Sequence, residues 1–224
     1  VLKGAPMYHL TQKYGIAYQE TPPYEVLYTN WLSYEEVLKL KRVEEMVEIY
    51  YNSCQFDKTL LVLKESFESP FQMFEELAKE YESKGYFVNT PSRSYRYRIL
   101  LDFAASREPE KEELFRELLT CDYYLRENAK SRPDFCMDLL PFYREISDFY
   151  EKEEKCPQYL KDYQGYHAKQ MMKMTHMERL HYPVWEEDAA KIMRRRTGVY
   201  VLYDYQKRNP LTMDAKMTLI FWGK

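Results

Sequence analysis

The amino-acid sequence predicts a mainly α, α+β protein in which a bundle-like layer of about six helices precedes a small C-terminal antiparallel β-sheet. Two observations predict this fold. Between residues 33 and 155, apolar residues recur at helical spacing behind recognisable helix caps. After about residue 166, segments rich in aromatic and β-branched residues are bounded by Pro or Gly, which is typical of short strands.

The helices are identified by their caps. The first has a capping box, Ser33 with Glu36, and should run to about residue 52. Another has Ser69 as its cap, Pro70 at its first position and Gly85 placed to end it. The other helices are expected over residues 60–67, after Pro91, from about 109 to 129, and over 141–155.

The strands are expected in three C-terminal segments. The segments MMKMTHMERLHYPVW, GVYVLYDYQ and KMTLIFWG read as strands, and EEDAAKIMRRR between the first two reads as a helix or helical turn. Val1 and Leu2 could close a strand ahead of the turn at Gly4. The predicted organisation is a linker over 1–32, a helical domain over 33–160 and a small β-rich subdomain over 161–224.

Charge and hydropathy restrict the classes of partner. Lys and Arg total 33 against 36 Asp and Glu, and a net charge of −3 disfavours nucleic acid and anionic membranes as partners of the whole surface. No stretch approaches the roughly 20 apolar residues of a membrane span, and no leader opens the chain, so we expect a cytoplasmic protein without a membrane partner. The one dense basic patch reads either as an exposed helix end or as a nucleic-acid contact, and consists of Lys191, Arg194, Arg195 and Arg196.

Three histidines lie close to a methionine-rich run, which raises the question of a copper site. On a strand, Met172, Met174 and His176 would face one side, while Met177 and His181 would face the other. The ligands would diverge, so no metal site is expected and the methionines are interpreted as adaptable core residues.

The segment CDYYLRENAKSRPDF is the strongest candidate site. Asp122 falls on the buried stripe of its helix, where Arg126 at i+4 could neutralise it as a structural ion pair, which is the favoured interpretation. The functional interpretation is that basic and polar residues here converge on an anionic or polar ligand, with a similar balance in LYDYQKRNPL. The candidate substrate or interdomain contacts are Asp122, Tyr124, Arg126, Asn128, Lys130, Arg132, Asp204, Arg208 and Asn209.

A family resemblance covers nearly the whole chain. KGAPMYHLTQKYG resembles the passage that follows the last barrel strand in cobalamin-binding radical SAM enzymes: Val1-Leu2 as the strand, Gly4-Ala5-Pro6-Met7 as the turn, and a helix ending at Gly15. Downstream blocks look like a domain of unknown function attached to the C-terminus of such enzymes, namely PPYEVLYTNWLSYEE, LKRVEEMVEIYYNS, FESPFQMFEEL, YYLRENAKSRPDF and YDYQKRNPLT.

The resemblance implies that the partners are radical SAM and cobalamin-binding domains upstream in the same chain. An iron–sulfur cluster, S-adenosylmethionine and cobalamin would then belong to the full-length parent and none to this fragment. The C-x-x-x-C-x-x-C triplet and the D-x-H-x-x-G signature are absent from it, and four cysteines are scattered at Cys54, Cys121, Cys136 and Cys156. No catalytic residue of the family maps onto the sequence.

The leading hypothesis is a non-catalytic accessory domain that caps the radical SAM barrel and shapes its substrate site, with residues 1–32 as the linker from the barrel. A first alternative is a tRNA-binding accessory module, which would use the basic patch and tyrosine-rich faces. A second alternative is a structural or protein-interaction domain, in which the charged residues would point to separate solvent faces.

Overall fold

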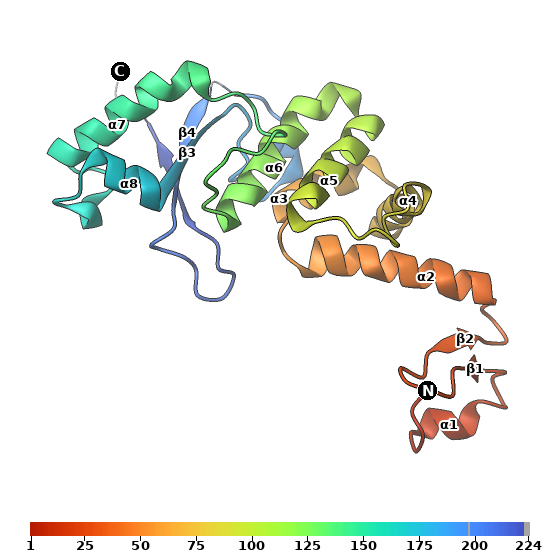
Figure 1. The fold of residues 1–224 in the computed structure, drawn as a ribbon. Helices are drawn as coiled ribbons and strands as arrows, with labels where there is room; N and C mark the ends of the chain where they lie inside the picture. The colour runs from red at the N-terminus through yellow and green to blue at the C-terminus, as the bar shows by residue number, and fades with distance from the viewer. Residues whose placement is uncertain (197, 222–224) are drawn as a thin grey trace.

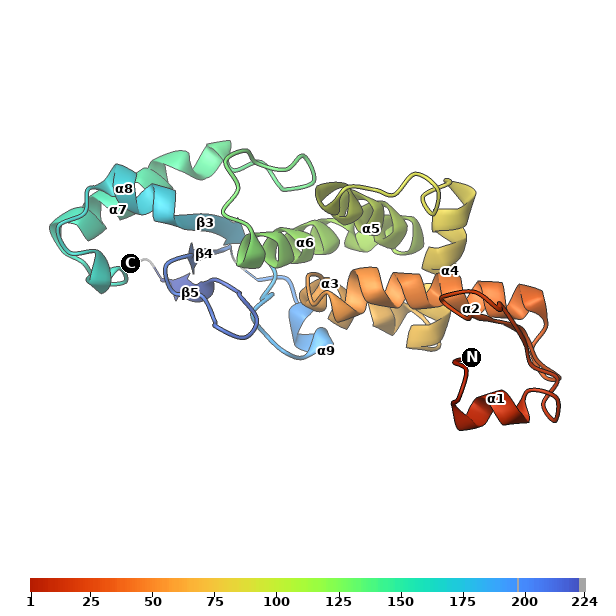
Figure 2. The same ribbon diagram turned by 60° about the horizontal axis from the view of Figure 1, so that its bottom comes forward.

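The computed structural model describes residues 1–196 and 198–221 of the chain. The molecule is elongated, with an N-terminal arm at one end, helices in the middle, and a small sheet with its covering helices at the other end (Figures 1 and 2). The arm, residues 1–32, consists of α1 (Pro6–Leu10), β1 (Ala17–Tyr18) and β2 (Val26–Tyr28).

The helical body confirms the five helices predicted before residue 130. They are α2 (Tyr34–Met46), α3 (Asp57–Leu63), α4 (Pro70–Ser83), α5 (Arg93–Arg107) and α6 (Glu112–Arg126). A π-helical segment, Val47–Asn52, extends α2 to the predicted end of the first helix, and 3₁₀ turns follow α3 and precede α6.

The predicted caps explain where these helices begin and end. The Ser33 hydroxyl accepts the backbone N–H of Glu36, whose carboxylate accepts the N–H of Ser33 at 2.8 Å, so the capping box is complete. Ser69 accepts the N–H of Gln72 at 3.2 Å at the start of α4. After α4, Gly85 adopts φ +69°, a left-handed conformation that favours glycine.

The C-terminal part confirms the sixth predicted helix and the small antiparallel sheet. It contains α7 (Tyr143–Lys155), α8 (Ala168–Met174), β3 (Thr175–Leu180), α9 (Ala189–Ile192), β4 (Val199–Asp204) and β5 (Lys216–Ile220). The strands are antiparallel in the order β3-β4-β5. With about half of its residues helical and only short strands, the described chain confirms the mainly α, α+β class.

One predicted strand begins later than expected. Residues Met171–Met174 form the end of α8, and β3 starts only at Thr175. The side chain of Gln170 accepts the N–H of His167 in a capping box, and methionine is a good helix former, so local signals favour the helix here. The predicted strand faces of Met172 and Met174 are therefore wrong. The last two residues of the third predicted strand lie outside the described residues.

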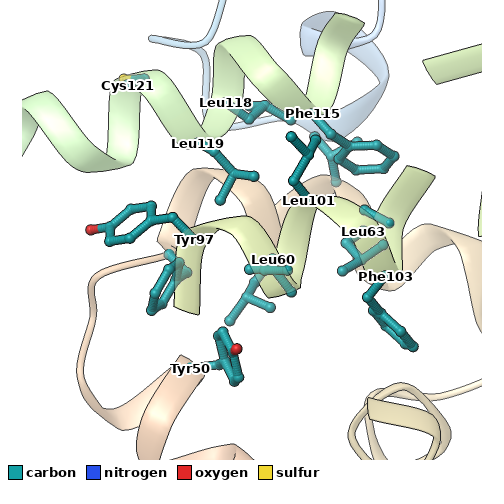
Figure 3. Packing of buried hydrophobic residues seen from close by; sticks show 14 of the residues in the cluster. Tyr50, Leu60, Leu63, Tyr97, Leu101, Phe103, Phe115, Leu118, Leu119 and Cys121 are labelled. Carbon is teal, nitrogen blue, oxygen red and sulfur yellow. The ribbon is translucent and has the colours of Figure 1, made fainter. Parts of the chain in front are cut away.

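Two hydrophobic cores lie on the two faces of β4. Val201 and Tyr203 join the core of α2–α6, whereas Tyr200 and Leu202 join a second core with α7 and α8, as the alternation of side chains along a strand requires. Figure 3 shows the first core, in which α3, α5 and α6 contribute Leu60, Leu63, Tyr97, Leu101, Phe103, Phe115, Leu118 and Leu119. Because α7 packs on the sheet, the second core spans the predicted domain boundary at residue 160.

The arm is a small unit of its own. Strands β1 and β2 pair antiparallel, and Asn30 donates its N–H to the carbonyl of Tyr14 at 3.0 Å. Gly15 has φ +58°, and a Cβ there would lie 1.9 Å from Asn30 Oδ1, so this turn requires glycine. Val1 and Leu2 are not in a strand, which corrects the expectation for this segment. Among the described residues, no helix is long and apolar enough to cross a bilayer.

Candidate functional site

Asp122 is buried in α6, but its predicted ion pair with Arg126 is wrong. Its carboxylate instead caps the first turn of α3. Oδ1 accepts the backbone N–H of Lys58 at 3.0 Å, and Oδ2 accepts the N–H of Thr59 at 2.9 Å and its hydroxyl at 2.7 Å. The residue at the start of α3 offers no side-chain cap, so Asp122 satisfies donors that the helix leaves open. Burial raises the pKa of Asp122 to about 7, and these hydrogen bonds limit the rise.

Arg126 belongs to a different set of contacts, which fastens the loop after β4 to the end of α6. Its Nε lies 2.5 Å from Asp214 Oδ1, and its guanidinium donates to the carbonyl of Cys54 at 2.9 Å. Arg208 donates to the carbonyl of Arg126 at 3.1 Å, and Asn209 Oδ1 accepts backbone N–H groups of its own loop. We call Arg126, Arg208, Asn209 and Asp214 the Arg126 cluster. Its contacts are all made within the protein.

Two other predicted residues also hold the chain together. Asn128 donates from its side-chain amide to the carbonyl of Lys173 at 3.0 Å, which ties the loop after α6 to α8. Asp204, at the end of β4, accepts the hydroxyl of Tyr163 and the backbone N–H of Gln206 at 3.0 Å. Neither predicted residue lines the cavity described next.

The remaining predicted residues, Tyr124, Lys130 and Arg132, come together at the junction of α6, α7, α8 and β3. Here the buried carboxylate of Glu178, 2 % exposed, accepts His176 Nε2 at 2.6 Å and the Arg132 guanidinium at 2.9 Å. The His176 ring stacks on Tyr124, with 3.6 Å between ring centroids and 13° between planes. We call Tyr124, Arg132, His176 and Glu178 the Glu178 cluster.

A cavity of about 210 Å³ opens beside the Glu178 cluster. Its apolar wall is formed by Leu139, Ile146, Met172 and Met177, and its aromatic wall by Tyr124, Tyr143 and Tyr150. Besides the tyrosine hydroxyls, Lys130, Arg132, Thr175 and His176 contribute polar side chains, and no carboxylate is among the described residues that line it. The cavity therefore combines apolar walls with groups that are basic or hydrogen-bonding.

The electrostatics of the cluster follow from its contacts. Burial alone would raise the pKa of Glu178, but the hydrogen bonds from His176 and Arg132 outweigh burial and lower it. The carboxylate is therefore held ionised beneath the cavity. It neutralises Arg132 and fixes the orientation of the imidazole through Nε2.

The three C-terminal histidines are separated, each against a different glutamate. His167 contacts Glu154 and His176 contacts Glu178. The third forms part of a possible ligand set of Glu113, Glu117 and His181. Glu117 is already used there, since it accepts the ring Nδ1 of His181 at 2.9 Å as well as the N–H groups of His181 and Tyr182. This set carries no argument for a metal.

The predicted basic patch lies beside acidic residues. The guanidinium of Arg195 lies 2.8 Å from Glu113, and Lys191 and Arg196 lie 3.9 and 4.0 Å from Glu186. These carboxylates offset part of the charge that a nucleic-acid backbone would need. No observation on the described residues favours this patch as a site.

The cysteines do not suit an iron–sulfur cluster. Cys54 and Cys156 are exposed, Cys121 is buried in α6, and Cys136 is half-buried in the following loop. Among the described residues, no cysteine belongs to a set of three or more side chains close enough to share a metal. Burial raises the pKa of Cys121 and of Cys136 to about 12, so without a metal both thiols are protonated at neutral pH.

Sequence reasoning identified Tyr124, Lys130 and Arg132 but missed His176 and Glu178 as site residues. The signal was present, because residues i and i+2 of a strand share a face, and the pair falls at this spacing. The pairing of Glu178 with Arg132, 46 positions away, depends on the tertiary fold and leaves no local pattern.

A family model described as a protein of unknown function (DUF4080) matches residues 12–203, which include both clusters except for the loop after β4. No curated protein and no solved structure matches the chain. Because the family model spans most of the sequence, the chain belongs to the family of unknown function DUF4080.

Proposed function

We propose that this chain is an accessory domain of a cobalamin-dependent radical SAM enzyme, and that it packs on the catalytic barrel and helps to shape its substrate site. The proposal starts from the resemblance of residues 4–15 to the passage that follows the last barrel strand in such enzymes. The iron–sulfur cluster, S-adenosylmethionine and cobalamin would be held by the upstream domains.

The observation that carries the proposal is the number of exposed apolar side chains on the arm. Trp31 is 70 % exposed and Leu2 is 64 % exposed, and α1 buries none of its residues. Other large side chains exposed on the arm are Met7, Tyr8, Tyr28 and Leu32. Exposed apolar surface of this kind favours packing on another protein surface.

The arm presents these residues in a fixed conformation. Strands β1 and β2 pair, Gly15 in the turn before β1 lies against Asn30 after β2, and the ring centroids of Tyr14 and Trp31 lie 5.5 Å apart. The arm projects at one end of the molecule, where β2 packs on α2 and Lys41 of α2 forms an ion pair with Glu25 (Figures 1 and 2). A preorganised projection of this kind needs little ordering when it meets a partner.

An apolar groove lies between three helices of the helical body. Helices α2, α3 and α4 enclose a groove of about 640 Å³, lined mainly by apolar side chains that include Val43, Val47, Leu61 and Phe71. Such a groove gives the proposed interface a second apolar surface on the same chain.

The proposal has a direct genetic test. The reading frame that encodes the residues before Val1 should encode the C-x-x-x-C-x-x-C triplet of a radical SAM barrel. A reading frame that lacks the triplet contradicts the proposal outright.

A binding test locates the interface. The 224-residue chain should bind the separately expressed upstream domains, and Trp31→Asp should weaken binding at least about tenfold, since it charges the exposed apolar surface. Leu211→Asp is the matched control, because Leu211 is 92 % exposed in the loop after β4, outside the arm. Equal binding by both variants would contradict the assignment of the arm.

A further inference from the structure

We propose that the cavity beside the Glu178 cluster is a binding site for a small organic monoanion, a carboxylate with a compact apolar or aromatic body. Helices α7 and α8 and strand β3, which contribute residues to the cavity lining, lie at the end of the molecule opposite the arm (Figures 1 and 2), so this site is separate from the surface proposed to meet the barrel. It does not depend on which enzyme the chain belongs to.

Several polar side chains of the cavity are already hydrogen-bonded within the protein. Thr175 Oγ1 donates to the carbonyl of Met171 at 2.8 Å, so the hydroxyl of Tyr150, 2.7 Å away, must donate to Thr175. Four of the five Arg132 N–H donors are directed to Glu178 and the carbonyl of Met137. These side chains are committed to the protein.

Two nitrogen atoms at the cavity have no hydrogen-bond partner among the described residues. Within the residues that the structure describes, Lys130 Nζ has no hydrogen bond or ion pair, although Lys130 lines the cavity. The imidazole of His176 uses Nε2 on Glu178, and no described residue bonds its Nδ1. When the ring is protonated, Nδ1 presents an N–H donor. The groups available to a ligand therefore include an ammonium and an imidazole nitrogen.

The net charge around the cavity favours an anionic ligand. Lys130 and Arg132 contribute two positive charges, and Glu178 beneath the cavity contributes one negative charge. With the imidazole protonated, so that Nδ1 donates, the site carries a net charge of +2 and attracts an anion. A carboxylate also offers two acceptor oxygens, one for Lys130 and one for His176.

The size and shape of the cavity limit the ligand. A volume of about 210 Å³ lies below the roughly 300 Å³ at which sites for drug-sized ligands begin, so the ligand is small. Leu139, Ile146 and Met172 form a wall for an apolar body, and methionine adapts to its outline. The rings of Tyr143 and Tyr150 offer faces for an aromatic body.

The test uses benzoate as the probe and benzamide as its uncharged isostere, with the full 224-residue chain in a calorimetric titration. Benzoate should bind with a Kd of about 1 mM or tighter, and benzamide at least about tenfold more weakly. No heat of binding with benzoate, or equal binding of the two compounds, would overturn the proposal.

Variants assign the binding to this cavity. Lys130→Gln removes an exposed ammonium that makes no hydrogen bond or ion pair with the described residues, so the fold is retained, and benzoate affinity should fall at least about fivefold. Lys169→Gln makes the same change on α8 outside the cavity and should leave the affinity unaltered. His176→Gln should weaken binding too. If Lys130→Gln and Lys169→Gln bind benzoate equally, the ligand lies elsewhere and the assignment fails.

Discussion

The Arg126 cluster and the Glu178 cluster both join a basic residue from the end of α6 or the loop after it to a carboxylate from the C-terminal subdomain. In the Arg126 cluster, the arginine, its aspartate and the adjacent loop residues satisfy one another. In the Glu178 cluster, a similar arginine–carboxylate contact lies beside a cavity, and Lys130 and one imidazole nitrogen of His176 have no hydrogen-bond partner among the described residues. The two clusters differ in their polar atoms and not in their charge. A binding site has polar atoms without a partner in the protein, whereas a purely structural contact does not.

The two arginines, Arg126 and Arg132, have different roles. Arg126 fastens the loop after β4 to α6, whereas Arg132 holds Glu178 in place so that Glu178 can orient His176. The first role is complete within the protein, and the second leaves a group available to a ligand. Substitutions in the two clusters should therefore differ in what they change.

The largest expected effect is on stability, from Glu178→Ala. The substitution leaves Arg132 and His176 half-buried without their carboxylate, and removing one partner of a buried ion pair costs about 3 to 5 kcal/mol of unfolding free energy. Urea denaturation measures the change. Glu187→Ala, at an exposed glutamate, is the control and should stay within about 0.5 kcal/mol of the unsubstituted chain. A loss below about 1 kcal/mol for Glu178→Ala would mean that the cluster is not held by this carboxylate.

A smaller effect is expected from Arg126→Met. The half-buried contact with Asp214 and the hydrogen bond to the carbonyl of Cys54 are lost, which should cost about 2 kcal/mol in urea denaturation. The affinity for benzoate should remain unaltered, because none of these residues lines the cavity. A parallel loss of benzoate affinity in the folded variant would show that the two clusters are coupled.

The predicted fold and the predicted site differ in how far sequence reasoning reached. The helix caps at Ser33 and Ser69 are local signals, and they placed α2 and α4 correctly. The strand predicted from residue 171 failed at its start, because methionine fits both a buried strand and a helix and the preceding capping box decides between them.

The candidate site was predicted only in part, for a physical reason. Helical spacing correctly buried Asp122, yet could not reveal that α3 would bring N–H donors to it across 63 or 64 positions. Because Asp122 and Arg126 are close in sequence, Arg126 was predicted as the partner of Asp122 in place of the backbone N–H groups of α3. Tyr124, Lys130 and Arg132, three of the candidate residues, lie together at one cavity, but His176, which also lines it, comes from a strand distant in sequence.

The smallest expected effect is a difference in acid sensitivity. The pKa of Glu178 is lowered from 4.5 in the native state, so near and below that pH the unfolded chain binds more protons at this residue than the native chain. Its contribution to stability is present above this range and is lost as the pH falls through it. Glu178→Gln should remove this part of the acid dependence, which urea denaturation between about pH 3.5 and 7 would measure.

Glu117 supplies the opposite case. Burial raises the pKa of this glutamate despite its bonds to His181 and Tyr182. Its contribution is present at low pH and is lost as the pH rises through the raised value. Glu117→Gln should therefore change the pH dependence with the sign opposite to that of Glu178→Gln. Changes of the same sign in both variants would contradict the electrostatic description of the Glu178 cluster.

The most direct measurement of the central claim, that the cavity beside the Glu178 cluster takes an organic carboxylate, is a crystal structure of the chain with 4-bromobenzoate, in which the anomalous signal of bromine marks the ligand. The claim predicts the bromine within the cavity and the carboxylate within hydrogen-bond distance of Lys130 and His176 Nδ1. A ligand seated at the Arg126 cluster, or in the apolar groove between α2 and α4 with the cavity left empty, would contradict it.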